Sequence, residues 1–260
     1  MDMLLQTYTA LSIIMAVYMS AWCAVAFLIR RNDVADVAWG LGFFVVTVAA
    51  FVMGSPLVDR GFLVVVLVGV WALRLSSHIY LRNRSKTEDY RYQQWRHDWG
   101  KWFYLRTFLQ VFMLQGFLVL VVSLPAVLTT IYRGGSWQIT DVVGFAIWLF
   151  GFFFESVGDR QLANFLKNPA NKGKLIQTGL WKYTRHPNYF GEIAQWWGVG
   201  VISLAVPYGV VGLIGPLTIT WLITKVSGVP LLEEKMARHP DFAEYKRKTN
   251  MIVPWIPKSS

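Results

Sequence analysis

The chain has 260 residues, of which 55% are hydrophobic and 15% are charged, and its mean hydropathy is +0.40. Soluble domains carry about 25% charged residues, so this composition excludes an ordinary soluble domain and indicates an all-α integral membrane protein. The net charge is +10, and the single cysteine, Cys23, excludes an intrachain disulfide.

Long apolar runs recur along the chain, and about 20 apolar residues are enough for a helix to cross the hydrocarbon core. We expect seven transmembrane helices in one membrane domain over residues 1–260. The spans are predicted near residues 5–29, 34–53, 61–81, 106–131, 140–158, 189–206 and 208–228. The first is a retained span rather than a signal peptide, because no basic residue precedes Arg30.

Positive charge is concentrated in alternate connections between these spans. Arg30, Arg31 and the regions 74–106, 159–187 and 225–260 together hold 23 of the 25 Lys and Arg residues. The positive-inside rule places this side in the cytoplasm, with the N-terminus outside and the C-terminus inside. Residues 229–260 are expected to form a short cytoplasmic helix and a tail that caps the cofactor site. Attraction to anionic lipids accounts for many of these cations without a further function.

The start of the second predicted span carries two acidic residues, Asp33 and Asp36. Because they are three residues apart, they share one face of a helix. Asp33 is expected to cap the helix at the membrane surface. Asp36 enters the apolar run, where a carboxylate is costly and usually faces a cavity or a partner. It therefore either pairs with Arg31 or Arg74 or serves as a substrate-facing acid.

The third predicted span and the loop after it combine cations with aromatic residues. Arg74 and His78 are four apart and share a helical face, and the planar guanidinium of an arginine suits bidentate contact with phosphate. Further arginines of this loop could neutralise a phosphate-rich ligand: Arg82, Arg84, Arg91 and Arg96. A basic loop beside a membrane is common, but a lipid-binding tract gains nothing from the acids Glu88 and Asp89 among these cations, and they favour a binding site.

Polar residues continue beyond the fifth predicted span: Glu155, Asp159, Asn164 and Lys167. Glu155 and Asp159 are four apart on one face, where two acids repel each other unless each has a partner. Arg160 is one candidate partner, and the ribose hydroxyls of a ligand are another. Such a helix could hold a nucleotide, and the alternative is a solvated helix end.

The segment GLWKYTRHPNYFGE, residues 179–192, is too polar for a span and too aromatic for an ordinary loop. Pro187 fits the first turn of a helix. A helix N-terminus attracts phosphate, and Arg185 and His186 add to this attraction. No second His, Cys or acid stands at ligand spacing from His186 on the same helix, so we expect no metal site.

A polar stripe follows on the sixth predicted span, where Asn188, Glu192 and Gln195 recur at i, i+4 and i+7. It either lines a binding site or joins two helices by hydrogen bonds. After the seventh predicted span, Lys225 and Glu233 lie at the start of the cytoplasmic tail. For these two residues a solvated charged face is the ordinary explanation.

Motifs of the familiar soluble nucleotide sites do not occur in this sequence. No G-x-G-x-x-G follows a strand pattern, and neither G-x-x-x-x-G-K-[ST] nor G-x-S-x-G is present. A bound nucleotide would therefore occupy a membrane site of a different kind.

The chain contains five distinctive segments: NDVADVAWGLGF, WALRLSSHIYLRN, EDYRYQQWR, GDRQLANFLKN and GLWKYTRHPNYFGE. Together they resemble the DUF1295 branch of the steroid 5-alpha-reductase superfamily, over about residues 30–256. The resemblance implies a seven-helix protein of the bacterial inner membrane, or of the ER membrane in a eukaryote, with NADPH bound among the cytoplasmic halves of the helices. It also implies reduction of a carbon–carbon double bond conjugated to a ketone, in a lipid-like substrate that enters from the bilayer.

The resemblance also implies roles for individual residues. Asp159 corresponds to an aspartate that contacts the cofactor, and Asn188 and Glu192 correspond to groups on its nicotinamide side. Lys225 falls near an arginine that meets the phosphates, and Glu155 stands where the family often has Asn. The full set of candidate NADPH-binding residues is Arg74, Arg84, Arg91, Tyr92, Glu155, Asp159, Asn164, Lys167, Lys182, Arg185, His186, Asn188, Glu192, Lys225 and Glu233.

The candidate catalytic residues are Asp36, Tyr189 and Glu192. Asp36 is the match to the substrate-side glutamate of the family. The steroid reductases use a tyrosine of the third span to polarise the ketone, whereas this sequence has Trp71 in that neighbourhood. Tyr80, Tyr92 or Tyr189 could replace it as the proton donor.

Two other functions remain open on the sequence. Membrane methyltransferases of the isoprenylcysteine and phospholipid type, which use S-adenosylmethionine, also carry R-H-P-x-Y-x-G and a later acidic pair like Glu233-Glu234. However, the segments DVADVAWG and EDYRY match the reductase branch better, and basic loops suit a phosphate-rich cofactor. A non-catalytic lipid-binding protein would not need the polar stripes. We therefore expect an NADPH-dependent reductase of a steroid or isoprenoid enone, with membrane lipids as neighbours and no nucleic-acid partner. The sequence leaves the oligomeric state open, and a monomer is compatible with it.

Overall fold

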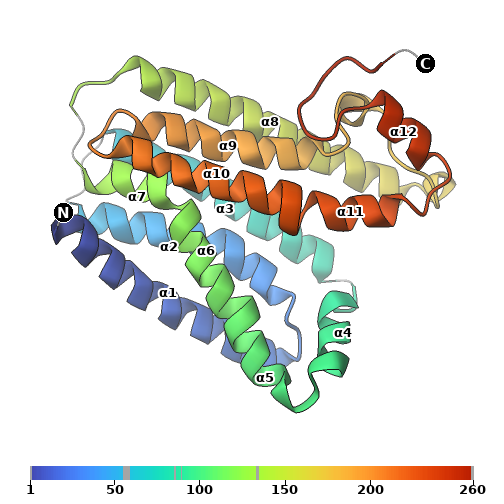
Figure 1. Ribbon diagram of the computed structural model, residues 1–260, viewed down its shortest axis with the longest axis horizontal. Coiled ribbons are helices and arrows are strands. Elements are labelled where there is room, and N and C mark those ends of the chain that lie inside the picture. Colours follow the sequence, from blue (N-terminus) through green and yellow to red (C-terminus); the bar gives the residue numbers. More distant parts are fainter. Residues whose placement is uncertain (1, 55–58, 85, 89, 133–134, 259–260) are drawn as a thin grey trace. The chain divides into compact units, whose positions relative to one another are not determined.

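The computed structural model describes residues 2–54, 59–84, 86–88, 90–132 and 135–258, and helices make up most of them (Figure 1). No strand occurs among these residues, although a single parallel bridge joins Thr184 and Asn250. The chain forms two compact units. The first unit is Met1–Trp137 with Ser203–Ile214, and the second unit is Gln138–Ile202 with Gly215–Ser260. The arrangement of the whole chain as one membrane domain stays a prediction.

The first unit consists of apolar helices and one polar helix, α4, and its most extensive helix contact is between α2 and α3. Its helices are α1 (Asp2–Ile29), α2 (Val34–Met53), α3 (Arg60–Asn83), α4 (Tyr90–Trp99), α5 (Phe103–Arg106), α6 (Leu114–Val122) and α7 (Leu124–Ile131). A Cβ on Gly40 would lie 2.4 Å from Ser76 Oγ, which donates to the Val37 carbonyl oxygen at 3.1 Å. The rings of Phe43 and Trp71 meet edge to face at 5.2 Å. Trp71 is therefore a core residue of this unit.

The second unit contains one long helix and several shorter ones. They are α8 (Ile139–Lys167), α9 (Pro187–Ser203), α10 (Ile214–Trp221), α11 (Val229–Met236) and α12 (Phe242–Lys248). A capping box starts α8, where the Asp141 carboxylate accepts from the Gln138 backbone N–H at 2.7 Å. The helix continues nine residues past the predicted span end at residue 158, because the following residues include strong helix formers, and it stops before Pro169.

In the part of the chain that the structure describes, six helical stretches are long and apolar enough to cross a membrane: Met3–Ile29, Val34–Met53, Arg60–Asn83, Tyr92–Val122, Ile139–Lys167 and Gly209–Met236. These stretches make the chain a multi-pass membrane protein. The predicted span 34–53 has the same bounds as α2. Helix α9 has 17 residues and is shorter than the six. A seventh crossing, the sides of the two termini and the cytoplasmic place of the C-terminal helix stay predictions.

The structure divides the predicted span 106–131 into several helical pieces. A π-helical stretch, Thr107–Met113, follows α5. The helix is interrupted a second time at Ser123, between α6 and α7. Pro125 lies in the first turn of α7, where its missing N–H leaves no helical bond unmade. Apolar periodicity alone does not reveal such breaks, because the apolar residues continue across them.

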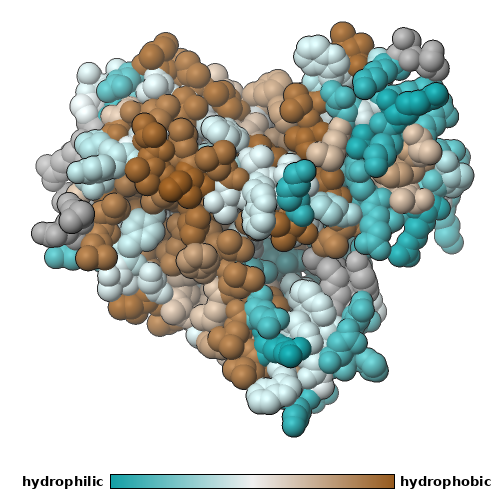
Figure 2. Space-filling model, viewed as in Figure 1, coloured by the Kyte–Doolittle hydropathy of each residue, from teal (hydrophilic) through white to brown (hydrophobic). Residues whose placement is uncertain are grey.

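The helices expose large apolar side chains, as membrane-spanning helices do. Leu28 of α1 is 82% exposed and Ile139 of α8 is 74% exposed. In Figure 2 hydrophilic residues gather over α12 in the second unit. Exposed apolar surfaces of this extent are compatible with lipid and not with water.

Candidate functional site

Helices α8 and α9 lie very close together because glycines face each other between them. A Cβ on Gly151 would lie 2.6 Å from the Gly191 carbonyl oxygen, and one on Gly191 would lie 2.4 Å from the Glu155 backbone nitrogen. Gly144 of α8 and Gly198 of α9 face each other in the same way, since a Cβ on Gly198 would lie 2.6 Å from the Gly144 carbonyl oxygen. The close approach of the two backbones brings the polar side chains beside these glycines into direct contact.

Two hydrogen bonds cross between these helices and form what we term the polar ladder. Asn188 Nδ2 donates to Asp159 Oδ1 at 3.1 Å, and Gln195 Nε2 donates to Glu155 Oε2 at 2.5 Å. Glu192 lies on the same face of α9, between the two amides. Each of the two acids of α8 therefore has an amide partner, which removes the repulsion expected from their spacing.

The ladder leaves two buried acceptor atoms without a partner. A carboxylate only accepts hydrogen bonds, so the amide nitrogens of Asn188 and Gln195 turn toward the acids and their oxygens turn away. In the described part of the chain nothing donates to Asn188 Oδ1 or Gln195 Oε1, and both atoms are buried. A buried unsatisfied acceptor costs about 1–3 kcal/mol. The arrangement therefore suits a ligand that carries O–H or N–H groups.

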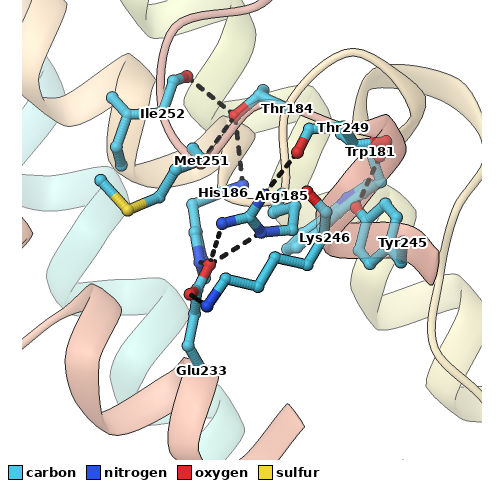
Figure 3. A network of polar contacts seen from close by, with 10 residues as sticks. All are labelled: Trp181, Thr184, Arg185, His186, Glu233, Tyr245, Lys246, Thr249, Met251 and Ile252. Carbon is cyan, nitrogen blue, oxygen red and sulfur yellow. Dashed lines mark hydrogen bonds and ion pairs between the residues drawn. The ribbon is translucent and has the colours of Figure 1, made fainter. Parts of the chain in front are cut away.

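The Arg185 guanidinium is enclosed by acceptors of the same unit (Figure 3). Its Nε and Nη2 donate to Glu233 Oε1 at 2.7 and 2.5 Å, and its Nη1 donates to the carbonyl oxygens of Lys246 and Thr249. Only 4% of Arg185 is exposed. The positive charge is compensated within the protein, so a phosphate would have to compete with Glu233 for it. The role of Arg185 as a cofactor ligand stays a prediction.

The next residue, His186, is completely buried and electrically neutral. Its Nε2 lies 3.4 Å from Glu233 Oε1, and its ring stacks on Tyr189 with centroids 5.7 Å apart. Burial lowers the pKa of His186 to about 4; the Glu233 carboxylate opposes this shift and Arg185 adds to it. A neutral imidazole does not attract phosphate by charge. Any polar contact of His186 with a ligand is therefore a hydrogen bond and not an ion pair.

Residues 249–258 form a C-terminal strap that lies along the segment before α9 (Figure 3). The Arg185 backbone N–H donates to the Asn250 carbonyl oxygen at 2.9 Å, and the Trp255 N–H donates to the Tyr183 carbonyl oxygen at 3.0 Å. Thr184 Oγ1 adds bonds to the carbonyls of Met251 at 3.1 Å and Ile252 at 2.8 Å. Next to the strap, the Tyr245 hydroxyl of α12 donates to the Trp181 carbonyl at 2.6 Å. We term residues 183–187 the R-H-P segment. The strap is joined to this segment through several independent hydrogen bonds.

The remaining predicted cofactor residues of the second unit are exposed: Asn164, Lys167, Lys182 and Lys225. They lie at the end of α8, before α9 and in the π-helical stretch Leu222–Val226. Glu233 is mostly buried by the Arg185 contact, with 16% of its side chain exposed. The structure does not bring the exposed residues into the polar ladder, and their role at a cofactor stays a prediction.

Asp36 of the first unit has a tyrosine partner from another helix. Tyr92 of α4 donates to Asp36 Oδ1 at 3.4 Å, and Tyr92 is 4% exposed. Arg31, one expected partner of Asp36, instead binds Asp33 at 2.7 and 3.1 Å, and this hydrogen bond raises the pKa of Arg31. Asp33 therefore forms an ion pair and does not cap α2 with its side chain.

The other candidate residues of the first unit are arginines of α3, α4 and the chain between them. Arg74 lies on α3, and Arg84 is exposed directly after the end of α3. The side chain of Arg91 lies outside the described residues. The role of these three arginines as phosphate ligands stays a prediction.

The expected set of site residues did not include Gln195, which the structure pairs with the buried Glu155. The signal was present, because Gln195 completes the i, i+4, i+7 stripe of α9. The glycine pairs that allow the contact also repeat at seven residues, as Gly144 and Gly151 in α8 and as Gly191 and Gly198 in α9. Small residues at a fixed spacing in two apolar helices indicate a close helix pair.

Comparisons with known proteins agree with this description. The family described as "Protein of unknown function (DUF1295)" matches residues 21–249. The chain is 28% identical to 3-oxo-5-alpha-steroid 4-dehydrogenase 1 of Rattus norvegicus over 116 residues, which are 44% of this chain and 41% of the relative. It is 38% identical to the Homo sapiens protein of that name over 66 residues, 25% of each chain. No solved structure matches the chain.

The curated matches cover well under half of the length of these relatives, and they do not favour the methyltransferase alternative. The family match, by contrast, extends over nearly the whole chain, including the polar ladder and the R-H-P segment. The chain therefore belongs to the DUF1295 family, which is part of the steroid 5-alpha-reductase superfamily.

Proposed function

We propose that the protein is an NADPH-dependent membrane reductase that saturates the carbon–carbon double bond of an enone lipid, such as a 3-oxo-4-ene steroid or an isoprenoid enone. The observation that carries the proposal is the polar ladder, whose buried oxygens Asn188 Oδ1 and Gln195 Oε1 have no donor among the described residues. Membership of the superfamily and the dehydrogenase names of the relatives support a reaction of this class.

A nicotinamide dinucleotide carries the donor groups that the ladder lacks. Its ribose hydroxyls and carboxamide NH₂ suit the amide oxygen of Asn188 and the carboxylates of Asp159 and Glu192. Its phosphates require cations, for which the exposed Lys182 and Lys225 are suited because no acid of the described residues forms an ion pair with them. Further cations at the phosphates are proposed from Lys167, Arg74, Arg84 and Arg91. When bound, NADPH supplies the hydride that is added to the β-carbon of the enone.

Asp36 and Tyr92 are proposed to hold a proton at the ketone oxygen of the substrate. The carboxyl and the phenol share a hydrogen bond at 3.4 Å, so one of them can donate to the oxygen as negative charge develops there. A preorganised donor of this kind contributes about 2.7–4 kcal/mol. The α-carbon then takes a proton from water, so that the enone gains one hydride and one proton. Tyr189, which stacks on His186, is the alternative phenol.

The remaining expectations form part of the same proposal. Helix α9 would be the seventh crossing, with its 17 residues spanning about 26 Å. The N-terminus would lie outside, and the basic loops and the tail inside, in a bacterial inner membrane or, in a eukaryote, the ER membrane. The substrate would enter from the bilayer, which the exposed apolar surfaces of the helices support. A monomer is sufficient for this chemistry.

The proposal is tested by turnover of purified protein in lipid nanodiscs. NADPH absorbance is followed with a 3-oxo-4-ene steroid, an isoprenoid enone and, as a control, the corresponding saturated ketone. We expect NADPH consumption with an enone, formation of the saturated ketone in equal amount, and no reaction with the control or with the Asp159→Ala variant. Absence of consumption with every enone, together with methyl transfer from S-adenosylmethionine, would refute the proposal.

A further inference from the structure

His186 has one ring nitrogen that the protein uses and one that it does not. Its Nε2 lies 3.4 Å from Glu233 Oε1. Its Nδ1 is buried, and among the described residues it has no hydrogen-bond partner. The residue itself is 0% exposed, so water does not satisfy this atom from the surface. A buried unpaired nitrogen of this kind requires an explanation.

The contact with Glu233 determines which nitrogen carries the proton. A carboxylate cannot donate, so Nε2 must hold the proton in order to bond to Glu233. Burial lowers the pKa of His186 to about 4, and the ring is neutral at physiological pH. A neutral imidazole has a single N–H. The unpartnered Nδ1 therefore presents a lone pair, which makes it an acceptor.

The surroundings hold the imidazole in this state. Arg185 fixes the Glu233 carboxylate through bonds of 2.5 and 2.7 Å, and Lys246 Nζ lies 3.9 Å from the second oxygen of that carboxylate. The stacked Tyr189 ring sets the plane of the imidazole, with 24° between the two rings. Two residues along the chain, Asn188 Oδ1 is a second buried acceptor without a partner. His186 Nδ1 and Asn188 Oδ1 are both neutral acceptors without a donor, so an uncharged O–H or N–H group of a ligand can satisfy them.

We propose that His186 Nδ1 is a ligand-binding atom that accepts a hydrogen bond from a hydroxyl or amide N–H group of the bound nucleotide, and that Glu233 is the positioning residue that keeps Nδ1 free of a proton. The inference rests on the proposed function, and it deepens that function by naming the chemistry of the contact. On this account the R-H-P segment binds a nucleoside part of the cofactor and not a phosphate.

The two amide substitutions of His186 distinguish its two nitrogens. In His186→Asn the shorter side chain keeps a polar oxygen near the place of Nδ1, and in His186→Gln the longer one keeps a polar group near the place of Nε2. We expect His186→Asn to bind NADPH within about threefold of the natural protein. We expect His186→Gln to bind about tenfold more weakly, the value of one hydrogen bond. Affinity is measured by energy transfer from tryptophan to NADPH.

Hydrogen exchange at the Trp255 amide, which bonds to the Tyr183 carbonyl, reports on the strap in the same samples. It should remain protected in His186→Gln, so that the lost affinity is not explained by a detached strap. The reverse order of affinities, equal losses in both variants, or no loss in either would overturn the inference. Absence of NADPH binding to the natural protein would overturn the proposed function, and this inference with it.

A measurement on the unmodified protein keeps the inference testable where a variant does not fold. In protein with ¹⁵N-labelled histidine, Nδ1 of His186 should show the chemical shift of an unprotonated ring nitrogen. That shift should change when NADPH is added. A protonated Nδ1, or an Nδ1 resonance that NADPH does not move, would overturn the inference.

Discussion

The buried Arg185 guanidinium links α11 to the C-terminal strap, because it binds both Glu233 of α11 and the carbonyl oxygen of Thr249 at the start of the strap. Arg185→Gln removes two bonds to Glu233 and two to backbone carbonyls. Glu233→Gln keeps the shape of the side chain but leaves a guanidinium nearly buried without its counter-charge. Lys246→Gln is the matched control, because Lys246 Nζ is 3.9 Å from Glu233 and 59% of its side chain is exposed.

The magnitude follows from the burial of the partners. Breaking a buried ion pair by removing one partner costs about 3–5 kcal/mol. With 5% of the Arg185 side chain and 16% of the Glu233 side chain exposed, the lower end of this range applies, about 3 kcal/mol. An exposed pair such as that of Lys246 contributes about 0.2–1 kcal/mol. At about 1.4 kcal/mol per factor of ten, opening of the strap should become about 100-fold more favourable in Arg185→Gln and less than about fivefold in the control.

The assay is native-state hydrogen exchange of the Trp255 amide, which bonds to Tyr183 when the strap is in place. We expect fast exchange in Arg185→Gln and Glu233→Gln, and little further change in the double variant, because the two residues act through one contact. Equal effects of Arg185→Gln and Lys246→Gln would refute the reasoning. Additive effects of the two single variants would also refute it.

Three further outcomes follow from the same contacts. Asp159→Ala and Glu192→Gln should each weaken NADPH binding, about tenfold or more by titration, and unchanged affinity in both would contradict the ladder site. Asp36→Asn and Tyr92→Phe should lower kcat about 100-fold and leave the Kd for NADPH unchanged. A loss of NADPH binding instead would contradict the role of this pair as the proton donor. The pKa of His186 is about 4 in the folded state against an ordinary 6.5. As the pH falls, the unfolded state therefore binds the proton at a higher pH than the folded state does. The free energy of unfolding should fall by about 3 kcal/mol from pH 6.5 to pH 4. Thermal unfolding over this range should show the loss in the natural protein but not in His186→Asn.

Local sequence patterns predicted the parts of the site that lie on single helices. The period of 3.6 residues placed Asn188 and Glu192 on one face of α9 and Glu155 and Asp159 on one face of α8, and the structure bridges the two faces at Asp159 and Asn188. The bounds 34–53 of α2 were also predictable, since charged residues precede the apolar run and a turn follows it.

Contacts between distant segments were not predictable in the same way. Glu233 is 48 residues from Arg185, and Tyr92 is 56 residues from Asp36, so no local period connects them. The strap is held largely by backbone atoms and hydroxyls, whose partners do not depend on a recognisable residue pattern. The neutral state of His186 likewise arises from burial, whereas the sequence motif suggested a cation beside a phosphate.

A nucleotide with many donor groups that binds at the polar ladder is central to the proposed function. The most direct measurement is the unfolding temperature of purified protein with NADPH, NADH and S-adenosylmethionine, since a ligand at 100 times its Kd stabilises the folded state by about 2.7 kcal/mol. We predict a clear rise with NADPH in the natural protein and none in Asp159→Ala. A rise with S-adenosylmethionine alone, or an equal rise with NADPH in both proteins, would contradict the account.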